Sequence, residues 1–235
     1  MDEIDRAHEL LKQLAPNGRD FVLRDPLEVD ECRWLLRAVG AGLASFQSCD
    51  PRCPRLKKWG VAGPDEFVTP AGAFRHLFSS PASPVAWLNR EYIPHIAAYA
   101  RAVLDLGYDS SQSSLSLYRR FTKDLINKKQ GVSYETDAEF YDADGSIYLH
   151  IEAKKDAVQV ARIAKQLVGA SSFSDLPANT AKEIEYVLDL QPKFLWLVGP
   201  GSIDPAPHIY AVTTSGLNAT FEQLTAVPRP PSRQL

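Results

Sequence analysis

A predicted β-hairpin between residues 132 and 153 constrains the fold of this chain more than any other feature. Residues 132–141 and 147–153 alternate between apolar and polar side chains, which is the period of a strand with two different faces. Asp144-Gly145 lies between them and is a strong signal for a tight turn. If these two residues form the tip, cross-strand partners have numbers that sum to 289, and Asp137 lies opposite Glu152.

This register gathers charged side chains on one face of the hairpin. By the same rule Glu135 faces Lys154, and Glu139 faces His150. Cross-strand partners have Cβ atoms about 5 Å apart, a separation at which two carboxylates can hold a divalent cation between them. A solvated strand face carries the same residue types, so the pattern is compatible with a metal site or with an exposed polar surface. The apolar face comprises Ala138, Phe140, Ile147, Leu149, Ile151 and Ala153.

Periodicity elsewhere predicts helices on both sides of the hairpin. Pro94 should kink the helix that contains it or mark a late start. Residues 119–128 are compatible with a strand or with a helix, whereas 48–70, rich in Pro, Gly and charge, indicate a linker or loop. Helices are expected at 4–14, 26–43, 70–78, 85–106, 157–170 and 181–190, and further strands at 115–126, 193–198 and 208–213.

These elements predict an α/β (α+β) protein with a mixed sheet flanked by helices. We expect a helical N-terminal subdomain over residues 1–80 and the α/β domain over residues 81–226. Residues 227–235 contain three prolines and are expected to form a disordered tail.

Composition limits the classes of function. No apolar run approaches the roughly 20 residues of a membrane helix, and the N-terminus lacks a secretory signal, so we expect a cytoplasmic protein without a membrane partner. A net charge of -3 argues against a protein that coats nucleic acid. Basic residues nevertheless gather around the hairpin, as DNA contacts or as solvated charges. The candidates for DNA contacts are Arg119, Arg120, Lys123, Lys155 and Arg162.

The three cysteines form an odd set. Cys32, Cys49 and Cys53 in a cytoplasmic protein are expected to be free thiols. Cys49 and Cys53, with His76 further along, could bind zinc, but no second pair with finger-like spacing is present.

The hairpin resembles the PD-(D/E)XK nuclease superfamily, and within it the Holliday-junction resolvases and small resolvase-like proteins. The resemblance rests on Glu135-Thr136-Asp137 and on Ile151-Glu152-Ala153-Lys154, which follow the family pattern of Gly-Glu-x-Asp and hydrophobic-Glu-x-Lys. Thr136 stands where the superfamily name has proline. The resemblance covers roughly residues 85–200 and implies a restriction-endonuclease-like core with the order helix, three strands, helix, strand.

The resemblance also implies a catalytic site. Mg²⁺ or Mn²⁺ would be held by Asp137, Glu152 and the backbone carbonyl of Ala153. Lys154 would position or activate the attacking water and offset charge that develops in the transition state. The family often adds an acidic ligand from the first core helix, which is Glu91 if that helix covers 85–106. Asp124 becomes the candidate if residues 115–128 are the core helix.

Four further residues are candidates for supporting roles. Gln166, and after it Gln159, resembles the polar position that many of these nucleases carry on the helix following the motif. Glu139 and His150 share the polar face of the hairpin, where His150 could contact a phosphate or be structural.

The function expected from the resemblance is a Mg-dependent deoxyribonuclease acting in repair, recombination, restriction or defence against mobile elements. One alternative is a catalytically inactive nuclease-fold protein that binds nucleic acid or a protein partner through its N-terminal helices. Another is an unrelated α+β interaction protein. A homodimer is compatible with each of these. Trp34, Trp59 and Trp87 could stack on bases or belong to the core.

Overall fold

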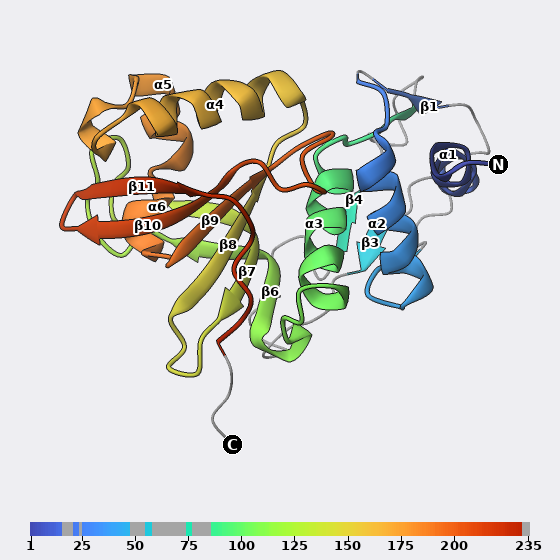
Figure 1. The fold of residues 1–235 in the computed structure, drawn as a ribbon, viewed down its shortest axis with the longest axis horizontal. Coiled ribbons are helices and arrows are strands. Elements are labelled where there is room, and N and C mark those ends of the chain that lie inside the picture. The colour runs from blue at the N-terminus through green and yellow to red at the C-terminus, as the bar shows by residue number, and fades with distance from the viewer. Residues whose placement is uncertain (16–20, 24, 48–54, 58–73, 77–85, 232–235) are drawn as a thin grey trace.

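The computed structural model describes residues 1–15, 21–23, 25–47, 55–57, 74–76 and 86–231. A six-stranded sheet in the order β11-β10-β9-β8-β7-β6 forms its centre (Figure 1). All neighbouring strands are antiparallel except β8 and β9, which are parallel, and the sheet is flanked by helices, so the expected α+β fold class is confirmed. The strands are β6 (Ser113–Arg120), β7 (Ser133–Tyr141), β8 (Ile147–Ala153), β9 (Phe194–Val198), β10 (Ile209–Ser215) and β11 (Asn218–Leu224).

The hairpin register agrees with the prediction from the turn as far as Ala138 and Ile151, whereas the predicted pairs Asp137–Glu152 and Glu135–Lys154 lie beyond the ladder, and the Lys154 N–H bonds to β9 instead. Ala138 pairs with Ile151, Glu139 with His150 and Phe140 with Leu149, and each pair sums to 289. A bulge after Phe140 shifts the pairing by one residue next to the tip. The apolar face is buried as expected, because Ala138, Phe140, Leu149, Ile151 and Ala153 belong to one hydrophobic cluster.

Three helices connect β8 to β9, because a parallel pair needs a crossover. They are α4 (Ala157–Gly169), α5 (Ala178–Ile184) and α6 (Tyr186–Leu190), with a 3-10 turn at Phe173–Asp175. The Asp156 carboxylate caps α4 by accepting a hydrogen bond from the Gln159 backbone N–H at 2.7 Å. The single helix expected at 181–190 is instead divided at Glu185 between α5 and α6. Together with Leu195 and Leu197, these helices build the hydrophobic core on one face of the sheet.

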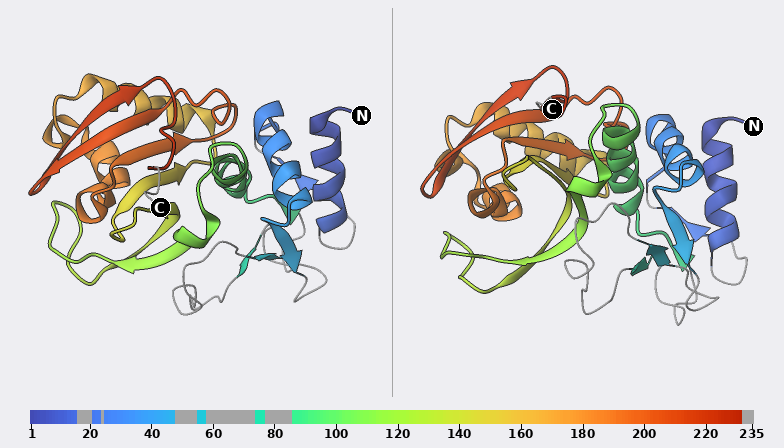
Figure 2. Two further views of the ribbon diagram at one scale, coloured as in Figure 1. Left: turned by 60° about the horizontal axis from the view of Figure 1, so that its bottom comes forward. Right: turned by 90° about the horizontal axis from the view of Figure 1, so that it is seen from below.

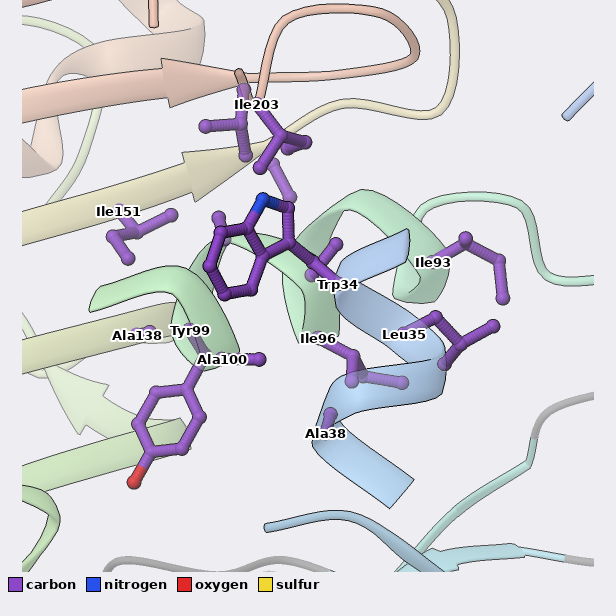
Figure 3. Close-up of a cluster of buried hydrophobic side chains, with 14 of the residues drawn as sticks. Trp34, Leu35, Ala38, Ile93, Ile96, Tyr99, Ala100, Ala138, Ile151 and Ile203 are labelled. Carbon is purple, nitrogen blue, oxygen red and sulfur yellow. The ribbon is translucent and has the colours of Figure 1, made fainter. Parts of the chain in front are cut away.

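On the opposite face, α3 (Tyr92–Leu104) packs against the sheet, α2 (Val29–Gly40) packs against α3, and α1 (Glu3–Leu14) packs against α2, so that the three helices lie side by side (Figure 2). Their buried side chains form one continuous cluster with those of β8 and β9. Trp34 extends from α2 toward Ile151 and Ile203 (Figure 3) and is 3% exposed. Trp34 is therefore a core residue, and the N-terminal helices share their core with the sheet.

Several local predictions differ from the structure. The helix expected at 85–106 runs from Tyr92 to Leu104, which confirms the late start that was one of two outcomes expected from Pro94; Pro94 lies in the first turn, where a missing N–H breaks no hydrogen bond. Residues 113–120 form β6, and no helix forms between Phe121 and Val132. β11 was not predicted. A 3-10 turn, Ser110–Gln112, precedes β6.

Short strands accompany the N-terminal helices. β1 (Phe21–Val22) pairs in parallel with β5 (Ala86–Trp87), and β2 (Ser45–Gln47), β3 (Arg55–Lys57) and β4 (Phe74–His76) form an antiparallel sheet. The helix expected at 70–78 is wrong for residues 74–76, which are extended, and its other positions lie outside the described residues. Cys49, Cys53 and Trp59 also lie outside them.

The C-terminal segment packs against the domain as far as it is described, contrary to the disorder expected from residue 227. Val227 is buried, the Tyr108 hydroxyl donates to the Pro228 carbonyl at 2.6 Å, and the Tyr148 hydroxyl donates to the Arg229 carbonyl at 3.0 Å. Composition alone missed this because tyrosines distant in sequence supply the donors.

Cys32 is a free thiol, as expected, and burial raises its pKa to about 12. Within the described ranges we find no helix with the length and apolarity needed to cross a bilayer.

Candidate active site

Asp137 lies in the middle of β7, next to Ala138, the residue at which the pairing with β8 stops. Its Oδ2 accepts a hydrogen bond from the Ala153 backbone N–H at 2.6 Å, which joins the carboxylate to the last residue of β8. The Asp137 side chain keeps 19% of its surface exposed. His95 on α3 holds the same residue from behind, since its Nε2 lies 2.7 Å from the Asp137 carbonyl and its Nδ1 lies 3.9 Å from Oδ1.

Glu152 and Lys154 form a nearly buried ion pair at the end of β8. The Lys154 ammonium contacts Glu152 Oε1, and His150 Nε2 lies 3.4 Å from Oε2. The Glu152 and Lys154 side chains are 10% and 11% exposed. The Lys154 backbone N–H donates to the Val198 carbonyl at 2.8 Å, so the parallel pairing with β9 continues through the residue that carries the ammonium.

Glu91, just before α3, belongs to the same group of charges. Burial raises the pKa of Glu91; the Lys154 charge opposes this rise and the Glu152 charge adds to it. Asp124, the other candidate for the third acidic position, is exposed in a turn, where it accepts a hydrogen bond from the Gln130 N–H at 3.0 Å. Of the two candidates, the structure brings Glu91 and not Asp124 to the cluster. We call Glu91, Asp137, Glu152 and Lys154 the acidic cluster.

The acidic cluster contains three carboxyl groups and one ammonium group, so its charges do not cancel. Burial, followed by the Glu152 and Glu91 carboxylates, raises the pKa of Asp137 well above its ordinary value. Burial would also raise the pKa of Glu152, but Lys154 and His150 outweigh it and lower that pKa. Burial alone would lower the pKa of Lys154, whereas the carboxylates raise it. The cluster therefore favours the protonated form of Asp137 more than an ordinary aspartate site does, and it keeps Lys154 charged at neutral pH.

The donor types in the acidic cluster fit a hard divalent cation. Carboxylates are preferred ligands of Mg²⁺ and Mn²⁺, and a cation would relieve the repulsion that raises the pKa of Asp137. In the described part of the chain, however, no three His, Cys, Asp or Glu side chains converge in a geometry that could hold a metal ion. Lys154 contacts the Glu152 carboxylate instead, so binding of a cation there requires that contact to open.

Glu139 and Arg119 form a structural pair. The buried Glu139 carboxylate accepts hydrogen bonds from Arg119 Nε at 2.9 Å and Nη2 at 2.5 Å, and from the Tyr141 hydroxyl at 2.6 Å. Burial would raise the pKa of Glu139, but the Arg119 hydrogen bond and charge lower it overall. Arg119 was expected to contact nucleic acid and Glu139 to support catalysis; the structure engages each with the other.

The candidates on α4 contact α5 rather than the acidic cluster. Arg162 pairs with Glu183 at 2.7 Å and donates to Thr180 at 2.6 Å. Gln166 accepts a hydrogen bond from the Thr180 hydroxyl, and Gln159 donates to Glu183 at 3.2 Å. These residues therefore join two helices of the crossover.

The remaining basic candidates differ in position. Arg120 ends β6 and is exposed, and Lys123 is half-buried in the turn that follows. Lys155 is exposed and lies next to Glu91. Its charge opposes the rise in the pKa of Glu91 that burial causes. Lys155 is thus the predicted nucleic-acid contact that the structure brings to the acidic cluster.

No family model, no curated protein and no solved structure matches the chain. Any function must therefore be inferred from the chemistry of the acidic cluster and from the fold that carries it.

Sequence reasoning missed two residues beside the acidic cluster. His95 contacts Asp137, as described above, from α3. Tyr186 on α6 packs its ring 4.9 Å from that of His150, and burial together with the Glu152 carboxylate raises the pKa of its hydroxyl. Both lie in apolar helical segments with no local motif. His95 and Tyr99 are four positions apart and therefore lie on the same face of α3, and Tyr99 stacks on Phe140 of the sheet. This spacing indicates that His95 also faces the sheet.

Proposed function

We propose that the chain is a metal-dependent nuclease of the PD-(D/E)XK type that hydrolyses phosphodiester bonds of DNA. One observation carries the proposal: Asp137, Glu152 and Lys154 meet where β8 ends and separates from the middle of β7, with Asp137 bound to the Ala153 amide and Lys154 to the Glu152 carboxylate. The element order α3, β6, β7, β8, α4, β9, with β9 parallel to β8, supports the same proposal.

The residues divide into ligands and a cation. Asp137, Glu152 and the Ala153 carbonyl would hold Mg²⁺ or Mn²⁺, with Glu91 as a further acidic group. When bound, the metal ion supplies a Lewis acid at the scissile phosphate. The hydrogen bond from the Ala153 backbone N–H holds the Asp137 carboxylate against the end of β8, so the position of this ligand is fixed by the backbone.

Lys154 has the properties of a charge donor rather than of a base. Its pKa is raised by the carboxylates around it, so the amine stays protonated at neutral pH. A protonated Lys154 can orient a water through its N–H groups and offset negative charge on the phosphate in the transition state. It cannot accept the proton of that water while it remains an ammonium ion.

Cleavage assays test the proposal. Linear, nicked, branched and single-stranded DNA, and RNA, are incubated with Mg²⁺, with Mn²⁺ or with EDTA. We expect metal-dependent cleavage of DNA and a loss of about 100-fold or more in Asp137→Asn and Lys154→Ala, the scale seen when one transition-state contact is removed. Lys165→Ala, which removes an exposed lysine on α4, is the matched control. Cleavage that survives unchanged in both site variants would show that the acidic cluster is not the active site.

A second candidate is a nuclease-fold protein that binds DNA without cutting it. It is favoured by the Lys154–Glu152 contact together with the lack of three converging metal ligands among the described side chains. Calorimetric titration with Mn²⁺ separates the two candidates. Binding of Mn²⁺ that is lost in Asp137→Asn supports the nuclease, whereas DNA binding without Mn²⁺ binding or cleavage supports the second candidate.

A further inference from the structure

A pocket of about 360 Å³ opens beside the acidic cluster. It is lined by the consecutive residues from Trp87 to Tyr92 and by Lys155. Glu91 belongs both to this pocket and to the acidic cluster, and Lys155 directly follows Lys154. A ligand in the pocket, which we call the Trp87 pocket, would therefore reach the rim of the acidic cluster.

The wall of the Trp87 pocket is held by buried polar contacts. The Arg90 guanidinium is 5% exposed; it pairs with the Glu31 carboxylate of α2 and donates to the Pro26 carbonyl at 2.9 Å. The Leu88 backbone N–H donates to the Val22 carbonyl at 3.2 Å. These contacts fix the segment on both sides of Asn89, so the pocket wall is preformed rather than assembled on binding.

Trp87 presents an aromatic surface to solvent at this pocket. It is 38% exposed, whereas Trp34 and Trp196 are 3% and 0% exposed. Among the described residues, it is the one aromatic member of the set of large hydrophobic side chains that remain exposed. An exposed indole beside a cationic and an amide side chain, here Lys155 and Asn89, has the composition of a site that stacks a base and contacts its phosphate.

We propose that the Trp87 pocket binds one unpaired nucleobase of the DNA strand, stacked on the indole of Trp87, while Lys155 contacts the adjoining phosphate. The proposal rests on the proposed function, since it assigns the nucleotide next to the phosphate that enters the acidic cluster. A paired base inside a duplex is covered on both faces by its neighbours and cannot stack on a side chain. The preferred substrate is therefore a strand with an unpaired nucleotide beside the scissile bond, such as a flap, a bulge or a single-stranded end.

Binding measurements without cleavage test this proposal. The probes are a fluorescent duplex with an unpaired thymidine extension, the same duplex with abasic sites in the extension, and a blunt duplex, all studied by anisotropy in EDTA. Trp87→Leu removes the ring and keeps an apolar side chain, whereas Trp87→Phe keeps a ring. Leu217→Ala, at an exposed position in the turn between β10 and β11, is the control.

The expected results are specific to the base. Stacking contributes about 1–3 kcal/mol per base, so Trp87→Leu should weaken binding of the thymidine extension about 5- to 150-fold and leave the abasic probe unaffected. Trp87→Phe and Leu217→Ala should bind both probes within a few-fold of the wild-type protein. Lys155→Ala should weaken both extended probes equally and reduce the salt dependence of binding, as expected for a phosphate contact.

Two results would overturn the proposal: equal weakening of the thymidine and abasic probes by Trp87→Leu, or no weakening of either. Its failure is distinguishable from failure of the proposed function. Cleavage that depends on Asp137 but not on Trp87 rejects the pocket and keeps the nuclease. Base-dependent binding through Trp87, without any cleavage that depends on Asp137, keeps the pocket and rejects the nuclease.

Discussion

Substitution of Gly199 by alanine should displace the backbone that carries Lys154. Gly199 follows β9, and a Cβ added there would lie 2.5 Å from Val160 Cγ2 and 3.3 Å from the Lys154 carbonyl oxygen. The contact with Val160 is far inside van der Waals distance, and Val160 on α4 is 2% exposed, so it has little room to turn away. Either the start of α4 or the Lys154 segment must shift to accept the methyl group.

The size of the effect follows from overpacking in a tightly packed core. One inserted methyl group of this kind costs about 1–3 kcal/mol in the free energy of unfolding. For a chain of 235 residues, each kcal/mol lowers Tm by about 2–4 °C, so Gly199→Ala should lower Tm by about 2–12 °C. Cleavage should fall as well, because the added methyl group also presses on the Lys154 carbonyl and would displace the backbone that carries the Lys154 ammonium.

A double-mutant cycle measured by thermal denaturation identifies the cause. Val160→Ala removes the methyl group that the new Cβ would meet, so Gly199→Ala should cost less than about 1 kcal/mol in that background. Loss of cleavage should be rescued in parallel with stability. An equal fall in Tm in both backgrounds, or no fall in either, would refute the predicted clash with Val160.

Three further predictions follow from the contacts around the site. Arg119→Ala should lower the free energy of unfolding by about 3–5 kcal/mol at pH 7, because the buried Glu139 carboxylate loses its cation. Since Arg119 lowers the pKa of Glu139, this stabilisation is complete above the unfolded pKa of about 4.3 and is lost as pH falls through the folded pKa. Denaturant melts from pH 7 to 3 should therefore show the difference in free energy of unfolding between variant and wild type narrowing. A constant difference would contradict the prediction. His95→Ala should reduce cleavage by about tenfold or more by loosening Asp137, and His95→Gln should recover part of that loss; cleavage as fast as that of a His208→Ala control would contradict this role. Tyr108→Phe and Tyr148→Phe should each cost about 0.5–1.5 kcal/mol and speed amide hydrogen exchange at Val227 and Arg229, and unchanged exchange in the double variant would argue against anchoring by the two hydroxyls.

The strands of the site were predictable because their information is local. The Asp144-Gly145 turn fixed the register, and alternation fixed which face of β8 would be buried. Neither signal distinguishes a solvated face from a covered one. His150 and Glu139, predicted to lie on a polar face, are fully buried because α6 and the turn after β6 cover that face, and such coverage depends on residues far along the chain.

The partners of the charged residues were not predictable for the same reason. Arg119 and Glu139 are 20 positions apart, and Arg162 finds Glu183 on a helix 21 positions away. A basic residue near a motif therefore does not by itself indicate a nucleic-acid contact, because a carboxylate distant in sequence can pair with it. Lys155 lies beside Glu91, and its contact with nucleic acid stays a prediction.

The core shared by the N-terminal helices and the sheet bears on how this protein can be divided. Trp34 and Leu35 of α2 and Ile96 of α3 belong to the cluster that contains Ile151 and Trp196. A fragment that begins at residue 81 would expose the helix surface that α2 normally covers, and it should aggregate rather than fold as an autonomous unit. For the same reason, helices α1 and α2 should not fold as an independent module when they are transferred to another protein.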